Sequence, residues 1–482
     1  MVENLKNLVD GEFVAASSGE TIDVFDPAHP DRLVGTVPSM SRSDLDAVFA
    51  AAEKGARVWR RTGTLERGNV LLKAAGLIRE RREALTELIV TEMGKTRAEA
   101  AGEVTKTAEF FDYYGAMGRD DNGQILPDAR PGTFAARYTE PLGVVLLITP
   151  WNDPLLTPAR KLGPALISGN AVVIKPATAT PLITLVLAQI LDEAGLPAGV
   201  LGTVTGRGSQ IGDALLEFEQ VKAVSFTGST AVGKSLQASL AGRNVRVQTE
   251  MGGKNAAVVL EDADLDLAVP TIVAGAFGGS GQRCTATSRL IVQRGIADRV
   301  RQRVAEAVAA LTVGPGGAEG VNLGPVVDAG AQESIRGFVT RALAEGAEVV
   351  STGARSAEAT DAGYFVEPTF LNIAVEHEIW SEEVFGPVLG MVEVDTLDEA
   401  IELVNGSAYG LSSTVFTRDL GNAFEFVQSV DTGQVSVNQP TTGWDIHHPF
   451  GGFKDSGSGY KEQGHDGLTF YTRIKTAAIR TR

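Results

Sequence analysis

The only cysteine of the 482-residue chain, Cys284, has neighbours that favour a chemical role over a packing role. Free cysteines are among the most buried residue types, so a packed core cysteine is the structural alternative. Here the five residues Gly278–Gln282 (GGSGQ) are all small or polar and leave the thiol unshielded on that side. Arg283 adjoins it, and a nearby cation lowers the pKa of a thiol and raises its thiolate fraction. We therefore interpret Cys284 as a nucleophile.

The five histidines supply no recognisable partner for this thiol. None of them belongs to a local Cys–His signature, and two adjacent histidines are typical of a polar loop. A cysteine hydrolase or esterase that works without a cofactor therefore stays open as an alternative, without support from a histidine base. The histidines are His29, His377, His447, His448 and His465.

Two polar residues follow strand-like runs and could face a common cleft. Glu250 opens the segment EMGGK directly after the run Val245–Gln248, and the two glycines remove bulk and allow a sharp turn. A surface turn is the alternative for this carboxylate. Asn152, in TPWN, follows the apolar run Val144–Ile148, and its amide could donate to a developing oxyanion. A turn or capping asparagine is the common alternative.

The elements that must position these residues alternate between strands and helices from residue 143 onward. Buried β-branched runs separated by helical patterns are typical of doubly wound, largely parallel sheets. Two such series in succession predict an α/β fold with two doubly wound units. Strands are predicted at 144–148, 171–174, 200–204, 221–225, 256–260, 348–350, 389–394 and 434–438. Helices are predicted at 182–194, 296–311, 331–345, 397–404 and 422–430.

The flanking segments have a different pattern. Residues 43–93 and 98–114 carry apolar residues at helical spacing and predict amphipathic helices. Residues 11–37 predict hairpins and turns, whereas the alternating run at 133–139 predicts a strand that crosses between larger units. The tail, 464–482, alternates Thr, Tyr and Ile chemistry and is expected to pair as an edge strand.

Composition excludes several classes of function. The chain carries 43 Lys and Arg against 60 Asp and Glu, and a net charge of −17 disfavours general binding to nucleic acid. Its apolar runs are too short to span a bilayer, and the start MVENLKNLVDGEF lacks the basic and apolar parts of a signal peptide. One cysteine cannot form a disulfide within the chain. We expect a cytoplasmic protein that binds neither nucleic acid nor membrane, and we assign no metal site.

Nine segments, taken in order, resemble the aldehyde dehydrogenase superfamily over essentially the whole chain. The loop Gly228–Gly233 (GSTAVG) resembles the family's own dinucleotide loop, and no G-x-G-x-x-G fingerprint is present. The segments are TPWNDP (149–154), ISGNAVVIKPA (167–177), AGLPAGVLGTVTG (194–206), SFTGSTAVGK (225–234), EMGGKNA (250–256), GQRCTATSR (281–289), EEVFGPV (382–388), SVNQP (436–440) and PFGGFKDSG (449–457).

The resemblance implies the family's domain organisation. Residues 1–122 and 141–252 would form a cofactor-binding domain, and residues 253–440 a catalytic domain. Residues 123–140 and 464–482 would form a strand-built oligomerisation arm of a homo-dimer or homo-tetramer. Residues 441–463 would return to line the pocket.

The resemblance also implies a mechanism. Cys284 would attack the aldehyde carbon, while the Asn152 amide and the Cys284 N–H hold the oxyanion. Loss of hydride to the nicotinamide would leave a thioester, which Glu250 would hydrolyse by activating water. The presence of this glutamate favours a free carboxylic acid as product over a coenzyme A thioester. Counting back from Lys475, the position of a proton-relay glutamate in the family is occupied by His465, so that role is not carried over.

NAD or NADP is the cofactor that the resemblance implies. Lys175 matches the lysine on the adenosine ribose, Glu383 the glutamate on the nicotinamide ribose, and Phe385 the aromatic beside the nicotinamide. Three residues after the lysine, NAD-preferring members commonly have a glutamate, and here it is Thr178. Its hydroxyl would not repel a 2′-phosphate, so NADP is expected to be accepted. Further cofactor contacts are assigned to Thr149, Pro150, Trp151, Phe226, Gly228, Ser229 and Val232.

The predicted substrate pocket contains Arg160, eight residues after Asn152. Succinic semialdehyde dehydrogenases have an arginine there that binds the substrate carboxylate, and an arginine fork suits a carboxylate. The loop 438–449 resembles that of α-ketoglutaric semialdehyde dehydrogenases. The alternative is an ion pair between Asp153 and Arg160 at the pocket edge, which would cancel the attraction of Arg160 for the carboxylate of a substrate. The other pocket residues assigned are Arg283, Thr285, Thr441, Thr442 and Trp444.

Three alternatives stay beside a carboxylated semialdehyde as substrate of an NAD(P)-dependent enzyme. The enzyme could oxidise neutral or aromatic aldehydes, or it could be the cofactor-independent cysteine esterase described above. The chain could also keep the fold without the chemistry, but the presence together of five matched residues argues against this. These are Cys284, Glu250, Asn152, Lys175 and Glu383.

Overall fold

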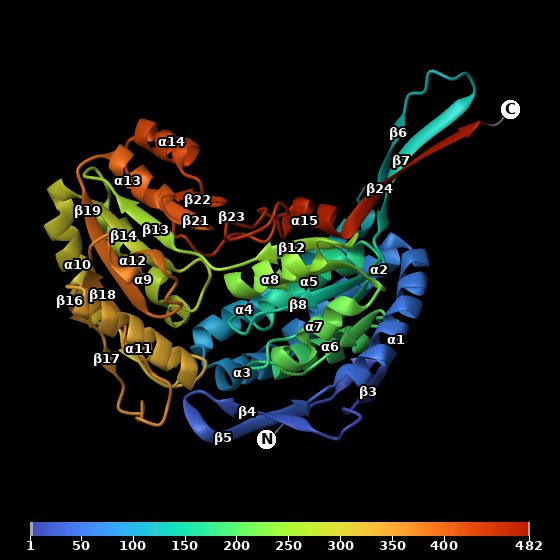
Figure 1. Cartoon of the computed structure of the whole chain (residues 1–482), viewed down its shortest axis with the longest axis horizontal. Coiled ribbons are helices and arrows are strands. Elements are labelled where there is room, and N and C mark those ends of the chain that lie inside the picture. Colours follow the sequence, from blue (N-terminus) through green and yellow to red (C-terminus); the bar gives the residue numbers. More distant parts are fainter. Residues whose placement is uncertain (1–2, 121, 481–482) are drawn as a thin grey trace.

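The computed structural model describes residues 3–120 and 122–480. The predicted ranges that include residues 1–2, 121 and 481–482 therefore extend at those positions outside the described residues. Two α/β units lie side by side, and a long β-arm projects from one end (Figure 1). No helix in the described part of the chain is long and apolar enough to cross a membrane.

The first unit is built on a five-stranded, fully parallel sheet of order β10-β9-β8-β11-β12. In register, Ile148 pairs with Lys175 and with Phe226, and Thr227 pairs with Glu250. The residues that follow these positions therefore emerge at one carboxyl edge. The strands are β8 (Val144–Ile148), β9 (Ala171–Lys175), β10 (Leu201–Thr203), β11 (Val221–Thr227) and β12 (Arg246–Glu250). The helices of this unit are α1 (Arg42–Arg61), α2 (Thr64–Glu80), α3 (Arg82–Met93), α4 (Arg97–Ala116), α5 (Leu156–Ile167), α6 (Leu182–Glu193), α7 (Gly208–Glu217) and α8 (Thr230–Leu240).

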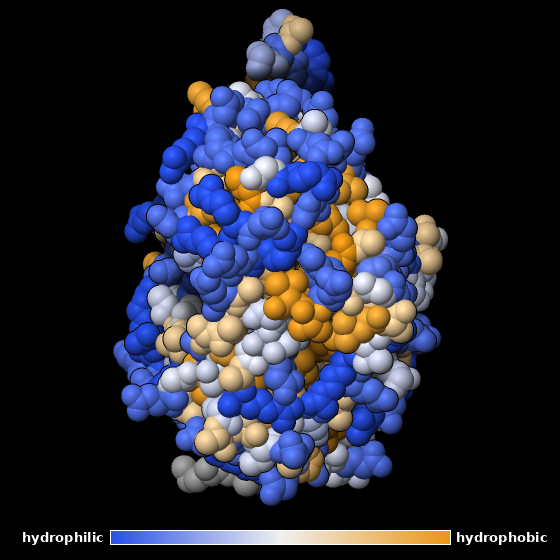
Figure 2. Space-filling model, turned by 90° about the vertical axis from the view of Figure 1, so that its left-hand side faces the viewer, coloured by the Kyte–Doolittle hydropathy of each residue, from blue (hydrophilic) through white to orange (hydrophobic). Residues whose placement is uncertain are grey.

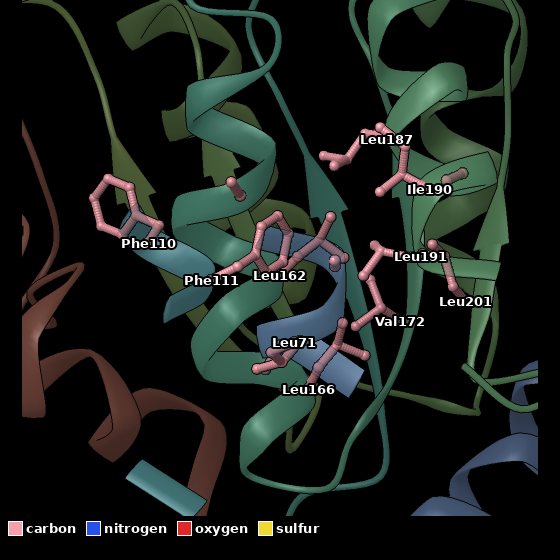
Figure 3. Close-up of a cluster of buried hydrophobic side chains, with 14 of the residues drawn as sticks. Leu71, Phe110, Phe111, Leu162, Leu166, Val172, Leu187, Ile190, Leu191 and Leu201 are labelled. Atoms are coloured by element: carbon pink, nitrogen blue, oxygen red, sulfur yellow. The ribbon is translucent and has the colours of Figure 1, made fainter. Parts of the chain in front are cut away.

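A large apolar core fixes α5 against the first sheet. Figure 3 shows Leu162 and Leu166 of α5 packed between the helices α2 and α4 on one side and β9, β10 and α6 on the other. Because this face of α5 is locked in the core, the residues on its other face have a defined direction. The remaining labelled members of this core are Leu71, Phe110, Phe111, Val172, Leu187, Ile190, Leu191 and Leu201.

The second unit is built on a seven-stranded sheet of order β16-β18-β19-β14-β13-β21-β22, in which only β16 runs antiparallel to its neighbour. Its strands are β13 (Asn255–Val259), β14 (Thr287–Gln293), β16 (Glu348–Thr352), β18 (Thr369–Asn372), β19 (Val388–Val394), β21 (Ser412–Phe416) and β22 (Gln434–Val437). Its helices are α9 (Leu265–Phe277), α10 (Ala297–Ala309), α11 (Ala329–Ala344), α12 (Glu378–Ser381), α13 (Leu397–Asn405) and α14 (Leu420–Ser429).

The arm pairs β6 (Gly123–Leu126), β7 (Thr133–Pro141) and β24 (Thr472–Arg480) as an antiparallel sheet of order β24-β7-β6. Its sequence alternates, and its apolar members are largely exposed. The smaller strands are β1 (Glu3–Asn4), β2 (Asn7–Val9), β3 (Glu12–Val14), β4 (Thr21–Asp26), β5 (His29–Pro38), β15 (Thr312–Val313), β17 (Ala354–Arg355), β20 (Tyr409–Gly410) and β23 (Phe453–Lys454).

The structure differs from the sequence prediction mainly in the tail. Residues Gly464–Tyr471 form a helix, α15, and only the rest of the tail forms a strand. The prediction of a strand throughout was wrong, because Phe470 and Tyr471 are buried against the first core and end a helical turn there. Glu250 is the last residue of β12 rather than the residue after the strand.

Candidate active site

A cavity of about 720 Å³ lies between the carboxyl edge of the first sheet and the amino ends of strands in the second unit. Cys284 precedes β14, and Glu383 and Phe385 precede β19. The predicted residues that line it are Thr149, Pro150, Trp151, Asn152, Asp153, Arg160, Lys175, Phe226, Gly228, Ser229, Val232, Glu250, Arg283, Cys284, Thr285, Glu383, Phe385, Thr442 and Trp444.

A left-handed turn presents the cysteine to this cavity. Gly279, Ser280 and Gly281 have φ values of 64°, 57° and 68°. Glycine is needed at 281, because a Cβ there would lie 2.1 Å from the Gly386 carbonyl oxygen. Ser280 has a strained positive φ, and a 2.7 Å hydrogen bond from its Oγ to the Gly324 carbonyl helps to hold it in this conformation. The chain therefore leaves α9 and turns sharply before Cys284.

The backbone and amide around Cys284 are arranged for an oxyanion. Asn255 Nδ2 donates to the Cys284 carbonyl at 2.7 Å and fixes its direction. Asn152 Nδ2 donates to the Gln282 carbonyl at 2.9 Å, which uses one of its two hydrogens and leaves the other. Within the described residues the Cys284 N–H makes no hydrogen bond. Two donors are thus free beside the thiol.

Burial raises the pKa of the Cys284 thiol to about 12, and the charge of Arg160 opposes this rise. Asp153, Glu250 and Glu383 act in the same direction as burial. The sequence assigned the activating cation to Arg283, but the Arg283 guanidinium lies 3.5 Å from Glu99 Oε1. The cation that favours the thiolate is therefore Arg160.

Glu250 is almost completely buried beside the thiol, at the end of β12. Gln248 Nε2 donates to its Oε1 at 3.2 Å, while its Oε2 is buried with no partner among the described residues. Burial and the neighbouring Glu462 raise its pKa well above the usual range, and Lys161, Lys461 and Arg160 oppose the rise. A carboxylate beside the thiol that keeps one oxygen without a partner in the described chain can accept a proton from water.

Lys161 and Glu462 form a buried ion pair behind this carboxylate. Lys161 Nζ donates to Glu462 and, at 2.7 Å, to Ser225 Oγ. Glu462 Oε2 makes no hydrogen bond in the described chain, and Arg160 Nη1 lies 3.7 Å from it. The pair places a second carboxylate close enough to raise the pKa of Glu250.

The other half of the cavity has groups suited to a dinucleotide. Lys175 ends β9, and burial lowers its pKa to about 8; its Nζ lies 3.3 Å from the Pro176 carbonyl. Burial raises the pKa of Glu383 to about 7, and Gly253 N–H donates to its Oε1 at 2.8 Å. Phe385 and Trp151 meet edge to face, with ring centres 5.4 Å apart.

The α8 terminus faces the same space. Ser229 is the N-cap of α8, and Gly228 N–H donates to the Glu250 carbonyl at 3.1 Å. The free amides of a helix N-terminus attract phosphate groups.

On the substrate side, Asp153 is paired with Lys95 rather than with Arg160. Lys95 Nζ contacts Asp153 Oδ1 and lies 2.6 Å from Glu103 Oε2. Glu103 Oε1 accepts from the N–H groups of Leu155 and Leu156, which holds the start of α5. Burial opposes ionisation of Asp153, but Lys95 and Arg283 outweigh it and lower its pKa. The alternative of an Asp153–Arg160 ion pair is therefore wrong.

Arg160 is held by aromatic rings and lacks a hydrogen-bond acceptor. Its guanidinium carbon lies 4.7 Å from the centre of the Phe450 ring and 5.9 Å from that of Phe110. Its side chain is 15% exposed, and its Nε is buried without a partner in the described chain. Such a group costs free energy unless a ligand or water accepts from it.

Residues 13–477 match the model of a protein family described as the aldehyde dehydrogenase family. The chain belongs to the aldehyde dehydrogenase family. Two curated relatives are the alpha-ketoglutaric semialdehyde dehydrogenase of Bacillus subtilis, 37% identical over 98% of both chains, and the alpha-ketoglutarate semialdehyde dehydrogenase of Haloferax volcanii, 42% identical over 99% of both. The solved structure of Staphylococcus aureus betaine aldehyde dehydrogenase in complex with NAD+ matches with a TM-score of 0.95 at 33% identity, over 99% of this chain and 95% of that one.

The predicted family and α/β fold are therefore confirmed, and this aldehyde dehydrogenase is an enzyme that oxidises an aldehyde with NAD or NADP. Two predicted site residues, Thr178 and Thr441, and the considered relay position His465 lie apart from its cavity lining. Thr178 Oγ1 donates to the Gly206 carbonyl at 3.3 Å. Thr441 is fully buried behind the wall, where its Oγ1 donates to the Thr285 carbonyl at 2.7 Å, so its assignment as a wall residue was wrong. His465 is 71% exposed and lies 4.0 Å from Asp120.

Sequence reasoning missed Lys161 and Glu462 in this aldehyde dehydrogenase. The buried carboxylate near Glu250 comes from Glu462, three residues before His465. His465, the position reached by counting back from Lys475, is exposed instead. No local pattern marks Lys161 and Glu462 as partners, because 301 residues separate them in the sequence.

Proposed function

We propose that this aldehyde dehydrogenase oxidises a short aldehyde that carries a carboxylate at its other end. The observation that carries the proposal is Arg160, which lines the cavity of Cys284 with a buried and unpartnered Nε. A carboxylate accepts two hydrogen bonds from an arginine fork and would satisfy this group. Asp153 in the pocket wall is paired with Lys95, and the acid beside Arg160, Glu462, lies behind the cavity with its Oε2 3.7 Å from Nη1. The semialdehyde dehydrogenases named above are consistent with a substrate of this class.

Catalysis would begin at the thiol. Cys284 Sγ, as thiolate, adds to the aldehyde carbon, and the charge of Arg160 favours the thiolate form. The developing oxyanion would take hydrogen bonds from the second Asn152 N–H and from the Cys284 N–H. When bound beside Glu383 and Phe385, NAD(P) would supply the hydride acceptor, and the loss of hydride from the thiohemiacetal carbon would leave a thioester on Cys284.

Hydrolysis would follow at the same carbon. Glu250 Oε2, which has no other partner, takes a proton from water, and the resulting hydroxide adds to the thioester. The carbon–sulfur bond then breaks, so the acid leaves and Cys284 is regenerated. Lys161 and Glu462 lie close to Glu250, and Glu462 would accept the proton from Glu250 before it passes to solvent.

The chain's own residues fit a dinucleotide. Lys175 is a buried lysine whose Nζ meets only a carbonyl, and it would hold the adenosine ribose. Gly252 leaves room that a Cβ would take from Glu383, 2.2 Å away, and Glu383 would bind the nicotinamide ribose. The relative from S. aureus was solved with NAD+. Three residues after Lys175 the chain has Thr178, where NAD-preferring members of the family commonly have a glutamate. This supports acceptance of NADP as well as NAD.

We also propose the domain roles and assembly that the family implies. Residues 1–122 and 141–252 would bind the cofactor, 253–440 would carry the nucleophile, and 441–463 would close the pocket. The arm, residues 123–140 and 464–482, would join copies of the chain into a dimer or tetramer. Its exposed apolar side chains and the unpaired edge of β22 support this. The exposed apolar residues of the arm are Ile125, Phe134, Ile474 and Ile479.

Apolar residues also gather on the end of the second unit that faces the viewer in Figure 2, between polar areas and below the projecting arm. The helix α14 contributes exposed Leu420, Phe424 and Val427 to the second unit, at helical spacing on one face.

A single free thiol that must stay reduced supports a cytoplasmic location.

The test of the substrate class is a rate comparison. Formation of NAD(P)H is followed by absorbance with 4-oxobutanoate and with butanal, which have the same carbon number and differ in the carboxylate. We expect a higher kcat/KM with 4-oxobutanoate. Arg160→Met should raise KM for 4-oxobutanoate far more than KM for butanal, while the loss of the cation beside the thiolate slows the reaction of both aldehydes. Equal effects of Arg160→Met on both aldehydes would reject the proposed substrate class.

A further inference from the structure

Arg160 stands between two different parts of the site. On one side it faces the cavity and is the cation that most favours the Cys284 thiolate. On the other side its Nη1 lies 3.7 Å from Glu462 Oε2. The rings of Phe450 and Phe110 hold the guanidinium in place between the two, so one cation serves both neighbours.

The acids behind the cavity depend on few cations. Glu250 and Glu462 are both buried, and Glu462 adds to burial in raising the pKa of Glu250. Lys161 contacts Glu462 Oε1, and Arg160 Nη1 lies 3.7 Å from Oε2, so two cations share this carboxylate. Lys461 also faces Glu250, with Asp466 beside it, and Tyr114 and Tyr471 face Glu462 from α4 and α15.

We propose that Arg160 is a positioning residue for Glu462 and Glu250, and that the substrate carboxylate and Glu462 share its guanidinium. The proposal rests on the function proposed above, because it takes the bound carboxylate from there. A carboxylate on Arg160 cancels part of the positive charge that stabilises the two buried carboxylates. The protonation of the hydrolytic base therefore depends on which aldehyde forms the thioester.

The direction of the effect follows from the charges. Glu250 must be deprotonated to activate water, so hydrolysis of the thioester has an acid limb in its pH profile. The acyl group of 4-oxobutanoate still carries its carboxylate at Arg160, whereas the acyl group of butanal carries none. We expect the acid limb of hydrolysis to lie higher with the carboxylated acyl group, by about half to one pH unit.

The experiment follows the acyl group on Cys284 directly. The enzyme with saturating NADP is mixed with a substoichiometric amount of 4-oxobutanoate or butanal, quenched at set times, and analysed by mass spectrometry of the Cys284 peptide. The decay rate is measured from pH 5 to 9. An acid limb at the same pH for both acyl groups would overturn the proposal, even if Arg160→Met raises KM for 4-oxobutanoate. The substrate class and the coupling therefore fail separately.

Two variants give matched controls. With the butyryl group, Arg160→Met should move the acid limb upward, because it removes the cation that both carboxylates use, whereas Arg160→Lys should return it toward the wild-type position. Glu462→Gln should shrink the difference between the two acyl groups, since the shared partner of Arg160 is then neutral. A role of Arg160 confined to substrate binding predicts no shift in any butyryl profile.

Discussion

Lys95 Nζ contacts Asp153 Oδ1 at the edge of the cavity, and this pair leaves Arg160 as a cation without a carboxylate in the substrate wall. The same ammonium lies 2.6 Å from Glu103, which holds the amino end of α5 through two backbone N–H groups. One buried lysine thus fixes both the charge of the pocket and the helix that carries Arg160.

Lys95→Met should destabilise the protein and weaken binding of a carboxylated aldehyde. Removing one partner of a buried ion pair costs about 3–5 kcal/mol, because the other charges are left uncompensated. Asp153 would then be free to attract Arg160, so KM for 4-oxobutanoate should rise more than KM for butanal. Thermal unfolding and the two KM values measure these effects.

The control for this prediction is Lys106→Met, which changes another lysine of the same cavity wall, one that forms no ion pair within the described residues. It should change stability by no more than about 0.5 kcal/mol. In the double variant Lys95→Met/Asp153→Asn, the KM for 4-oxobutanoate should return most of the way to its wild-type value, because residue 153 no longer carries a charge that attracts Arg160. If Lys95→Met alone leaves that KM unchanged, the ion pair does not protect Arg160.

The affinity for NADP should fall as the pH rises through about 8. Burial lowers the pKa of Lys175 to about 8, so its ammonium is charged below that pH and loses its charge above it. A phosphate prefers the charged form, and the dissociation constant for NADP should rise by up to tenfold per pH unit above pH 8. Fluorescence titration with NADP between pH 6.5 and 9.5 measures this. Lys175→Arg should give a flat profile, because arginine stays charged, and a flat wild-type profile would speak against the role of Lys175.

Thr178→Glu should turn the enzyme toward NAD. A carboxylate at this position would accept from a ribose diol and repel a 2′-phosphate, and a loss of about 1.4 kcal/mol is a tenfold drop in kcat/KM. We expect at least that drop with NADP and little change with NAD. Thr178→Val, which removes the hydroxyl but adds no charge, is the matched control and should have a smaller effect. An unchanged NADP to NAD ratio in Thr178→Glu would place the 2′-phosphate elsewhere.

Much of the site could be predicted from the sequence because its residues lie in short local patterns. Cys284 follows a run of small or polar residues, Glu250 ends a strand and Asn152 follows one, and the carboxyl ends of these strands meet at one edge of the first sheet. The strands themselves are buried β-branched runs, which a periodicity argument finds.

The rest depends on contacts between distant residues. The partner of Asp153 lies 58 residues earlier, and that of Lys161 lies 301 residues later, so no local spacing points to either. Thr441 has the polar character of a pocket residue, but hydrogen bonds to Thr285 and Thr287 use its hydroxyl inside the protein. The helix α15 was missed because its apolar residues pack on a core built from α2, α4 and α5.

The most direct test of the central claim uses Glu250→Gln, which keeps the shape of the side chain and removes the base. The variant is mixed with NADP and an equimolar amount of 4-oxobutanoate, and both the absorbance of NADPH and the mass of the Cys284 peptide are followed. The account predicts one equivalent of NADPH and a stable acyl group on Cys284, at a ratio of one to one. Turnover at the wild-type rate, or NADPH without an acyl group on Cys284, would contradict it.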